Sequence, residues 1–145
     1  MIWASIPGAE RLNLWKKLRV SIQDMEQQEQ LAEVAKFCAH IPFGSRSVDY
    51  YSPQDWPTPW EILYHGSFCT SSISILMFYT IAMSAEHVDI DLILVEDADG
   101  IFLLPIISNR YILNYELGKI SIHPEIRGSF KILRRFSKNE IKAIT

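Results

Sequence analysis

Cysteine is scarce in this chain, and its scarcity excludes two kinds of small stabilised domain. Only Cys38 and Cys69 occur among 145 residues, which is too few for a disulfide framework or for a structural zinc site built from thiolates. A domain of this length buries about two thirds of the surface of its unfolded chain, so it can fold without disulfides or a structural metal ion. Each thiol is therefore a buried side chain or a candidate nucleophile.

Charge of either sign is also not in excess. Lys and Arg total 14 and Asp and Glu total 17, which gives a formal charge of −3. A nucleic-acid-binding domain carries a strongly basic face, so nucleic acid is not expected as the main partner. Hydrophobic residues make up 48 % of the chain, which favours a folded domain over a disordered chain. We expect one domain spanning residues 1–145.

No apolar run is long enough to predict a membrane span. The most apolar stretch, residues 68–85, is shorter than the roughly 20 residues that cross a bilayer, and it is rich in hydroxyl side chains. Residues 1–8 lack the basic start and the apolar core of a signal peptide. We therefore expect a soluble protein, cytoplasmic or virion-associated, that has no membrane partner.

Apolar periodicity predicts three helices in the first part of the chain. Residues 10–22 and 25–39 each place apolar side chains on one face, and Asp24 is the expected N-cap of the second helix. Residues 69–85 are apolar on every side, which is typical of a central, buried helix. Residues 42–60, rich in proline and aromatic side chains, are expected to form a stiff loop that walls a groove.

The second half of the chain has the pattern of short strands joined by turns. The expected strands are residues 91–96, 101–107, 111–115 and 119–122, and residues 130–133 form a last strand or a short helix. Helices followed by an antiparallel meander of strands indicate an α+β fold.

Charged side chains gather in two segments. Acidic residues cluster between residues 86 and 99, and basic residues cluster between residues 127 and 142. The simplest interpretation is two solvated faces. The alternative is a pair of complementary patches, with Arg134 and Arg135 on the basic one, that dock onto a second copy of the chain or onto another protein. The aspartates at residues 97–100 match a hairpin turn better than a calcium loop, so no metal is expected.

Cys69 is the residue with the clearest chemical potential. It stands at the expected start of the helix over residues 69–85, where free amide groups and the helix dipole stabilise a thiolate. A cysteine nucleophile also needs a base within hydrogen-bond reach, usually a histidine oriented by Asp or Asn. These residues leave two interpretations open, a nucleophile or a small buried side chain at a helix start.

Three segments between residues 30 and 63, followed by Gly66 and Cys69, resemble the bacterial transglutaminase-like cysteine proteinases. The most specific part is residues 56–63, which read Trp-Pro-Thr-Pro-Trp-Glu-Ile-Leu; in that family this run precedes the catalytic cysteine. The resemblance covers about residues 25–120. It implies a transglutaminase-like, papain-like core, in which N-terminal helices and a central cysteine-bearing helix pack on an antiparallel sheet.

The chain departs from the family pattern at the catalytic positions. Cys69 is kept, but residues 67–71 read Ser-Phe-Cys-Thr-Ser, whereas the family has acidic residues there that some members associate with calcium. The strand that should carry the catalytic histidine has none, so this position, near Phe102, is lost. Asn114 stands where the family has its aspartate. His65, four residues before the cysteine, is a candidate substitute base.

The resemblance, together with the missing base, predicts a catalytically impaired domain that serves as a protein-binding or structural module. The proline-bracketed tryptophans and the Phe-Cys pair also resemble phage-encoded proteins, which suggests a virion component. A partner chain would lie in a groove beside Cys69, anchored by Trp56, Trp60 and Tyr64. The alternative is an active cysteine hydrolase, a peptidase or amidase, in which Cys69 attacks a carbonyl and Asn114 orients an unidentified base. No cofactor is implied.

Overall fold

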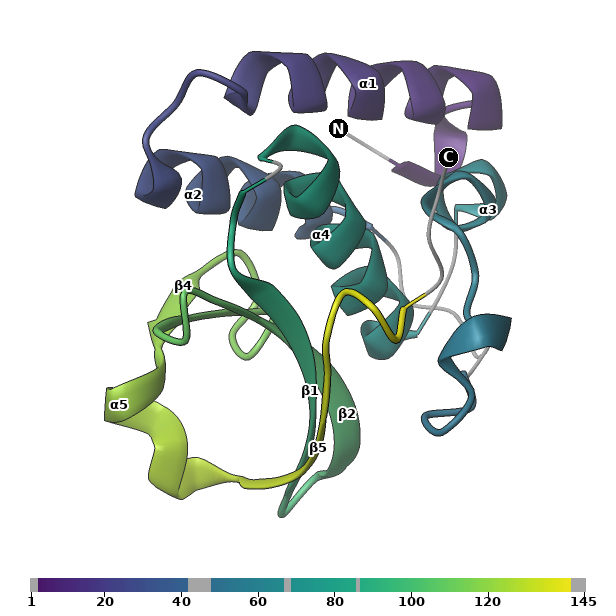
Figure 1. Cartoon of the computed structure of the whole chain (residues 1–145). Helices are drawn as coiled ribbons and strands as arrows, with labels where there is room; N and C mark the ends of the chain where they lie inside the picture. Colours follow the sequence, from purple (N-terminus) through teal and green to yellow (C-terminus); the bar gives the residue numbers. More distant parts are fainter. Residues whose placement is uncertain (1–2, 42–47, 67–68, 86, 142–145) are drawn as a thin grey trace.

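The protein has a helical N-terminal half and an antiparallel C-terminal sheet, which confirms the α+β class (Figure 1). The structure, a computed structural model, describes residues 3–41, 48–66, 69–85 and 87–141. Among these residues, no helix is both long and apolar enough to cross a membrane.

The first two long helices lie close to their expected positions. Helix α1 spans Gly8–Ile22, after a short 3-10 turn at Trp3–Ser5, and α2 spans Gln27–Cys38. The expected N-cap of α2, Asp24, is wrong, because the amide of Met25 bonds to the carbonyl of Ile22 and keeps the chain in a turn until Glu26. Glu26 is the N-cap, and it makes no side-chain capping hydrogen bond.

A short helix begins at the end of the segment 42–60, which we expected to be a loop, and continues to residue 65, where no element was expected. After a 3-10 turn at Pro53–Asp55, helix α3 spans Pro59–His65. Thr58 Oγ1 accepts from the amide of Glu61, and the Glu61 carboxylate accepts from the amide of Thr58, which together form a capping box. Proline at the first helical position suits this start. The sequence therefore carried the signal for α3, which the run of prolines obscured.

Helix α4 (Thr70–Ser84) is the centre of the fold, as expected. It contacts α1, α2 and α3 on one side and β2 (Gly100–Ile107) and β1 (Ile90–Asp97) on the other. Every residue from Ser71 to Ile81 is buried. The buried Thr80 hydroxyl is satisfied, because it accepts from Trp15 Nε1 at 2.8 Å and donates to the carbonyl of Leu76 at 2.7 Å.

The sheet contains five antiparallel strands in the order β4-β3-β2-β1-β5. Its remaining strands are β3 (Tyr111–Leu113), β4 (Ile120–Ile122) and β5 (Lys131–Phe136). Strands β1 to β4 form the expected meander, whereas β5 returns past α5 (His123–Ile126) and a 3-10 turn (Arg127–Ser129) to pair with β1 (Figure 1). The last segment is therefore a strand.

Arg11 links the residues before α1 to the end of α3 through hydrogen bonds. Its guanidinium is 7 % exposed and donates to the carbonyls of Leu63 at 2.6 Å and Tyr64 at 2.5 Å. It also donates to the carbonyls of Trp3 and Ile6. The C-terminal carbonyls of α3 carry partial negative charge, so they offset the buried cation without a carboxylate.

Gly66 completes this junction. It ends α3 in the left-handed region, at φ 73°, where glycine is favoured. A Cβ atom at this position would lie 2.6 Å from Arg11 Cζ. The chain can therefore turn tightly over the guanidinium only because residue 66 has no side chain.

Replacing Arg11 with Met should lower the free energy of unfolding by about 3 kcal/mol or more, because several buried carbonyls lose their donor at about 1–3 kcal/mol each. Gly66→Ala should also destabilise the chain, through strain and overlap with Arg11. Urea unfolding measures both effects. The exposed Arg127→Met is the matched control, with an expected change within about 0.5 kcal/mol. Equal stabilities of the Arg11 and Arg127 variants would contradict this role for Arg11.

Candidate functional site

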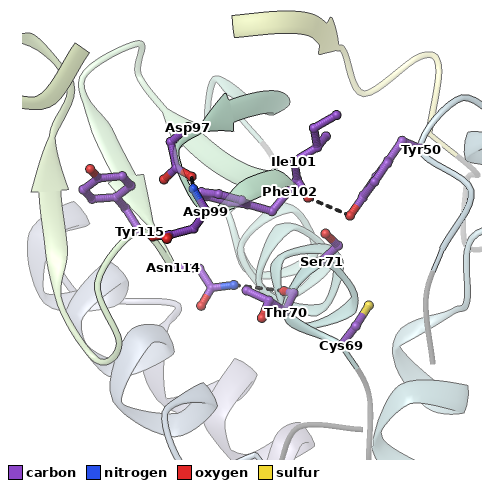
Figure 2. A pocket seen from close by; sticks show the side chains of 10 residues that line it. All are labelled: Tyr50, Cys69, Thr70, Ser71, Asp97, Asp99, Ile101, Phe102, Asn114 and Tyr115. Carbon is purple, nitrogen blue, oxygen red and sulfur yellow. Dashed lines mark hydrogen bonds between the residues drawn. The ribbon is translucent and has the colours of Figure 1, made fainter. Parts of the chain in front are cut away.

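A pocket of about 550 Å³ opens between the first turn of α4 and the start of β2 (Figure 2). It is lined by Tyr50, Cys69, Thr70, Ser71, Asp97, Asp99, Ile101, Phe102, Asn114 and Tyr115. The three positions at which the sequence resembles a catalytic triad, Cys69, the start of β2 and Asn114, therefore meet in one cavity.

Cys69 is the N-cap of α4, as the sequence predicted. Its side chain is partly exposed, and Sγ lies 3.4 Å from Ser72 Oγ. The sulfur thus stands at the positive end of a 15-residue helix, which is where a thiolate or a developing oxyanion is stabilised. Phe68, the other member of the Phe-Cys pair, lies outside the described residues.

Asn114 lies just past β3 and not on it, because its backbone is left-handed, with φ 66°. The side chain is buried, and its Nδ2 donates to the Thr70 carbonyl at 3.0 Å and to Ser74 Oγ at 2.8 Å. Both amide protons are therefore used to hold the end of β3 on the first turns of α4. Asn114 therefore lines the pocket with Cys69, and its side-chain amide is hydrogen-bonded to α4.

Two serines of α4 form hydrogen bonds with the backbone of β2 at a position that β3 does not pair. Leu103 donates its amide to Ser71 Oγ at 3.2 Å, and its carbonyl accepts from Ser74 Oγ at 2.6 Å. Tyr50 donates its hydroxyl to the carbonyl of Ile101 at 2.9 Å. The proline-rich segment therefore does wall this pocket, as expected, through Tyr50.

No histidine lines the pocket. All four histidines of the chain lie within the described ranges, and the lining residues at the start of β2 are Ile101 and Phe102. His65 ends α3, with its ring centroid 6.0 Å from that of Tyr64. His123 stacks on Phe130 beside the far face of the sheet.

None of the three aromatic side chains expected as anchors beside Cys69 lines the pocket. Trp56 is 2 % exposed, packs edge-on against Phe136 and donates Nε1 to the carbonyl of Asp49. Trp60 packs against Trp15 of α1, and the exposed Tyr64 lies over Gly8. The reason is α3, which packs against α1 and carries both residues away from the pocket.

Arg134 and Arg135 each contact an acidic side chain of the same chain. Arg135 Nε lies 2.5 Å from Asp91 Oδ2, because β5 pairs with β1 and joins the two charged segments within one chain. Arg134 lies 3.4 Å from Glu140 and over the Phe136 ring. The amide of Ser137, with help from Arg134, lowers the pKa of Glu140. Lys142, at the end of the basic segment, lies outside the described residues.

The acidic residues of the pocket form the expected hairpin turn. Asp97 Oδ1 accepts from the amide of Asp99 at 2.7 Å, and Gly100 follows with a positive φ. Within the part of the chain that the structure describes, no group of three or more His, Cys, Asp or Glu side chains is placed to hold a metal ion.

Comparisons with known proteins identify the fold. No family model and no curated protein matches the sequence. Among solved structures, calcium-bound LapG of Legionella pneumophila matches with a TM-score of 0.73 at 16 % identity, over 89 % of this chain and 75 % of LapG. EGTA-treated LapG matches with a TM-score of 0.74 at 16 % identity, over 90 % and 74 %. LapG is a bacterial transglutaminase-like cysteine protease, so the likeness confirms the expected fold.

The second thiol, Cys38, lies away from the pocket. It is 1 % exposed at the end of α2, and burial raises its pKa above the ordinary value. Burial also raises the pKa of Tyr79 to about 12. Neither side chain lines the pocket, so both bear on stability and not on the chemistry of the site.

Stability should fall as the pH rises above about 9. The unfolded Cys38 and Tyr79 lose their protons near 9.0 and 10.0, whereas the native chain keeps them, so the unfolded state binds fewer protons and is favoured. Urea unfolding from neutral pH to about pH 10.5 measures the decline. Cys38→Ala should flatten its first part, and an unchanged slope in that variant would contradict the assignment to Cys38.

Proposed function

We propose that this chain is a transglutaminase-like domain that binds an extended segment of another protein in the Cys69 pocket without cleaving it. The observation that carries the proposal is the composition of the pocket, which unites Cys69 and Asn114 with Ile101 and Phe102 and has no lining histidine. Losing a catalytic base lowers the rate of comparable enzymes by on the order of 10⁴-fold or more.

The rest of the pocket suits binding better than turnover. Asn114 donates both amide protons to α4, which leaves its Oδ1 as an acceptor, and no histidine lines the pocket to donate to that oxygen. The start of α4 still offers a partial positive charge to a peptide carbonyl, and three aromatic rings line the walls. A groove that holds a polypeptide in a protease can hold one equally well after the base is lost.

We expect no Cys69-dependent cleavage when the protein is incubated with a mixture of short peptides and analysed by mass spectrometry. The pocket should still bind such peptides, with NMR shifts at its lining residues, and a bulky maleimide on Cys69 should block binding. Cys69→Ser treated with the same maleimide is the control. Cleavage by the unmodified chain that disappears in Cys69→Ala would establish the active hydrolase instead.

A restoration experiment sharpens this test. Side chains alternate across β2, so Ile101 shares the α4-facing side with Leu103, whereas Phe102 packs with the cluster on the opposite face. Ile101→His should therefore speed the alkylation of Cys69 at neutral pH by about tenfold or more, and Phe102→His should do so less. No acceleration by either variant would show that the missing base is not what limits the thiol.

A narrower form of the proposal makes the chain a structural component that self-associates or joins a larger assembly, such as a phage virion built in the cytoplasm. The basic end of the chain would contribute through residues other than Arg134 and Arg135, which already contact Glu140 and Asp91. Arg127 and Lys131 are exposed on this end.

Reversing both charges, with Arg127→Glu and Lys131→Glu, should weaken assembly by about tenfold, because electrostatic complementarity is lost at an exposed surface. Sedimentation measures the assembly. The exposed pair Lys16→Glu and Lys17→Glu on α1 controls for net charge. Assembly that is unaffected by the Arg127 and Lys131 changes would remove the basic end from the proposal.

A further inference from the structure

The carboxylates that line the Cys69 pocket are not matched by basic side chains. Asp97 and Asp99 line it, and no lysine or arginine is among the lining residues. Asp97 uses one carboxylate oxygen for the turn, and neither aspartate takes part in an ion pair within the described chain. Two carboxylates thus face a cavity without a cation.

The uncharged polar groups of the pocket also offer acceptors more than donors. Asn114 is 8 % exposed and gives both Nδ2 protons to α4, so its remaining hydrogen-bonding atom is Oδ1, for which the described residues supply no donor. The Tyr50 hydroxyl proton is committed to the Ile101 carbonyl. The open acceptors of the pocket, which are Asn114 Oδ1 and the aspartate carboxylates, favour a ligand that supplies N–H groups.

Aromatic rings accompany these acceptors. Tyr50, Phe102 and Tyr115 line the same cavity. Figure 2 shows Tyr115 on the same side of the pocket as Asp97 and Asp99, with Cys69 on the other side. The face of an aromatic ring attracts a cation, and a neighbouring carboxylate adds to the attraction. The pocket therefore has an acidic, aromatic end and a thiol end.

We propose that the protein segment bound in this pocket presents an arginine or lysine side chain to the end formed by Asp97, Asp99 and Tyr115, while its backbone passes the start of α4 at Cys69. The inference rests on the proposed binding function. Arginine fits best, because its planar guanidinium donates five N–H groups and stacks on aromatic rings. No bond is made or broken.

The test compares the peptide acetyl-Gly-Gly-Arg-Gly-Gly-amide with its Lys, Gln and Glu counterparts, titrated into the intact protein at low salt and followed by NMR. The Arg peptide should bind about tenfold tighter than the Gln peptide, with shifts at the pocket residues, and the Glu peptide should bind least. The preference for Arg over Gln should shrink as salt is raised.

The variant Asp97→Asn with Asp99→Asn should abolish the preference for Arg over Gln. Asparagine keeps the side-chain oxygen that accepts from the amide of residue 99, so the turn is retained. The matched control, Glu29→Gln with Glu125→Gln, removes the same charge from two exposed residues that do not line the pocket, and it should leave the preference unchanged.

Each outcome separates this inference from the proposed function. Equal binding of the Arg and Gln peptides, a preference that survives in the Asp97 and Asp99 variant, or no binding of any peptide would overturn the cation site. Equal binding at the pocket would still leave the proposed function standing. Cleavage of the Arg peptide that requires Cys69 would overturn the proposed function while leaving the selectivity for a cation in place.

Discussion

A buried guanidinium that is satisfied by backbone carbonyls fixes the end of α3, a helix that packs against the cysteine-bearing α4. Arg11 bonds to the end of α3 and to the first residues of the chain, and Gly66 turns tightly above it. Three residues later the chain reaches Cys69 and enters α4. Because the charge has no carboxylate partner among these contacts, the geometry of the carbonyls alone offsets its desolvation. This junction fixes the end of α3, which packs against α4.

Polar contacts from α4 then shape the cavity. Ser71 and Ser74 bond to the backbone of Leu103, and Asn114 bonds to Ser74 and Thr70, so the helix, β2 and the end of β3 are joined around one buried network. A network in which each member has a partner is rigid. The same contacts fix the side chains of Ser71 and Asn114, which line the pocket.

Local sequence patterns predicted most of the elements and failed where two signals competed. Periodicity located α1 and α2, an apolar run located α4, and the turn residues located β1 and β2. The capping box that starts α3 was present in the sequence, but the surrounding prolines favoured a loop. The family resemblance brought Cys69 and Asn114 to one site, although the strand was expected to continue through Asn114, whose left-handed backbone ends it.

The sequence by itself determined that Cys69 stands at the start of a buried helix and that the chain has an α+β fold, because both follow from spacing, capping and turn chemistry within short segments. Only the tertiary structure decided which aromatic rings and charges face the pocket. Trp56 meets Phe136, and Arg135 meets Asp91, across long stretches of chain. Such contacts depend on how β5 and α3 pack against distant elements, and no local pattern encodes that choice.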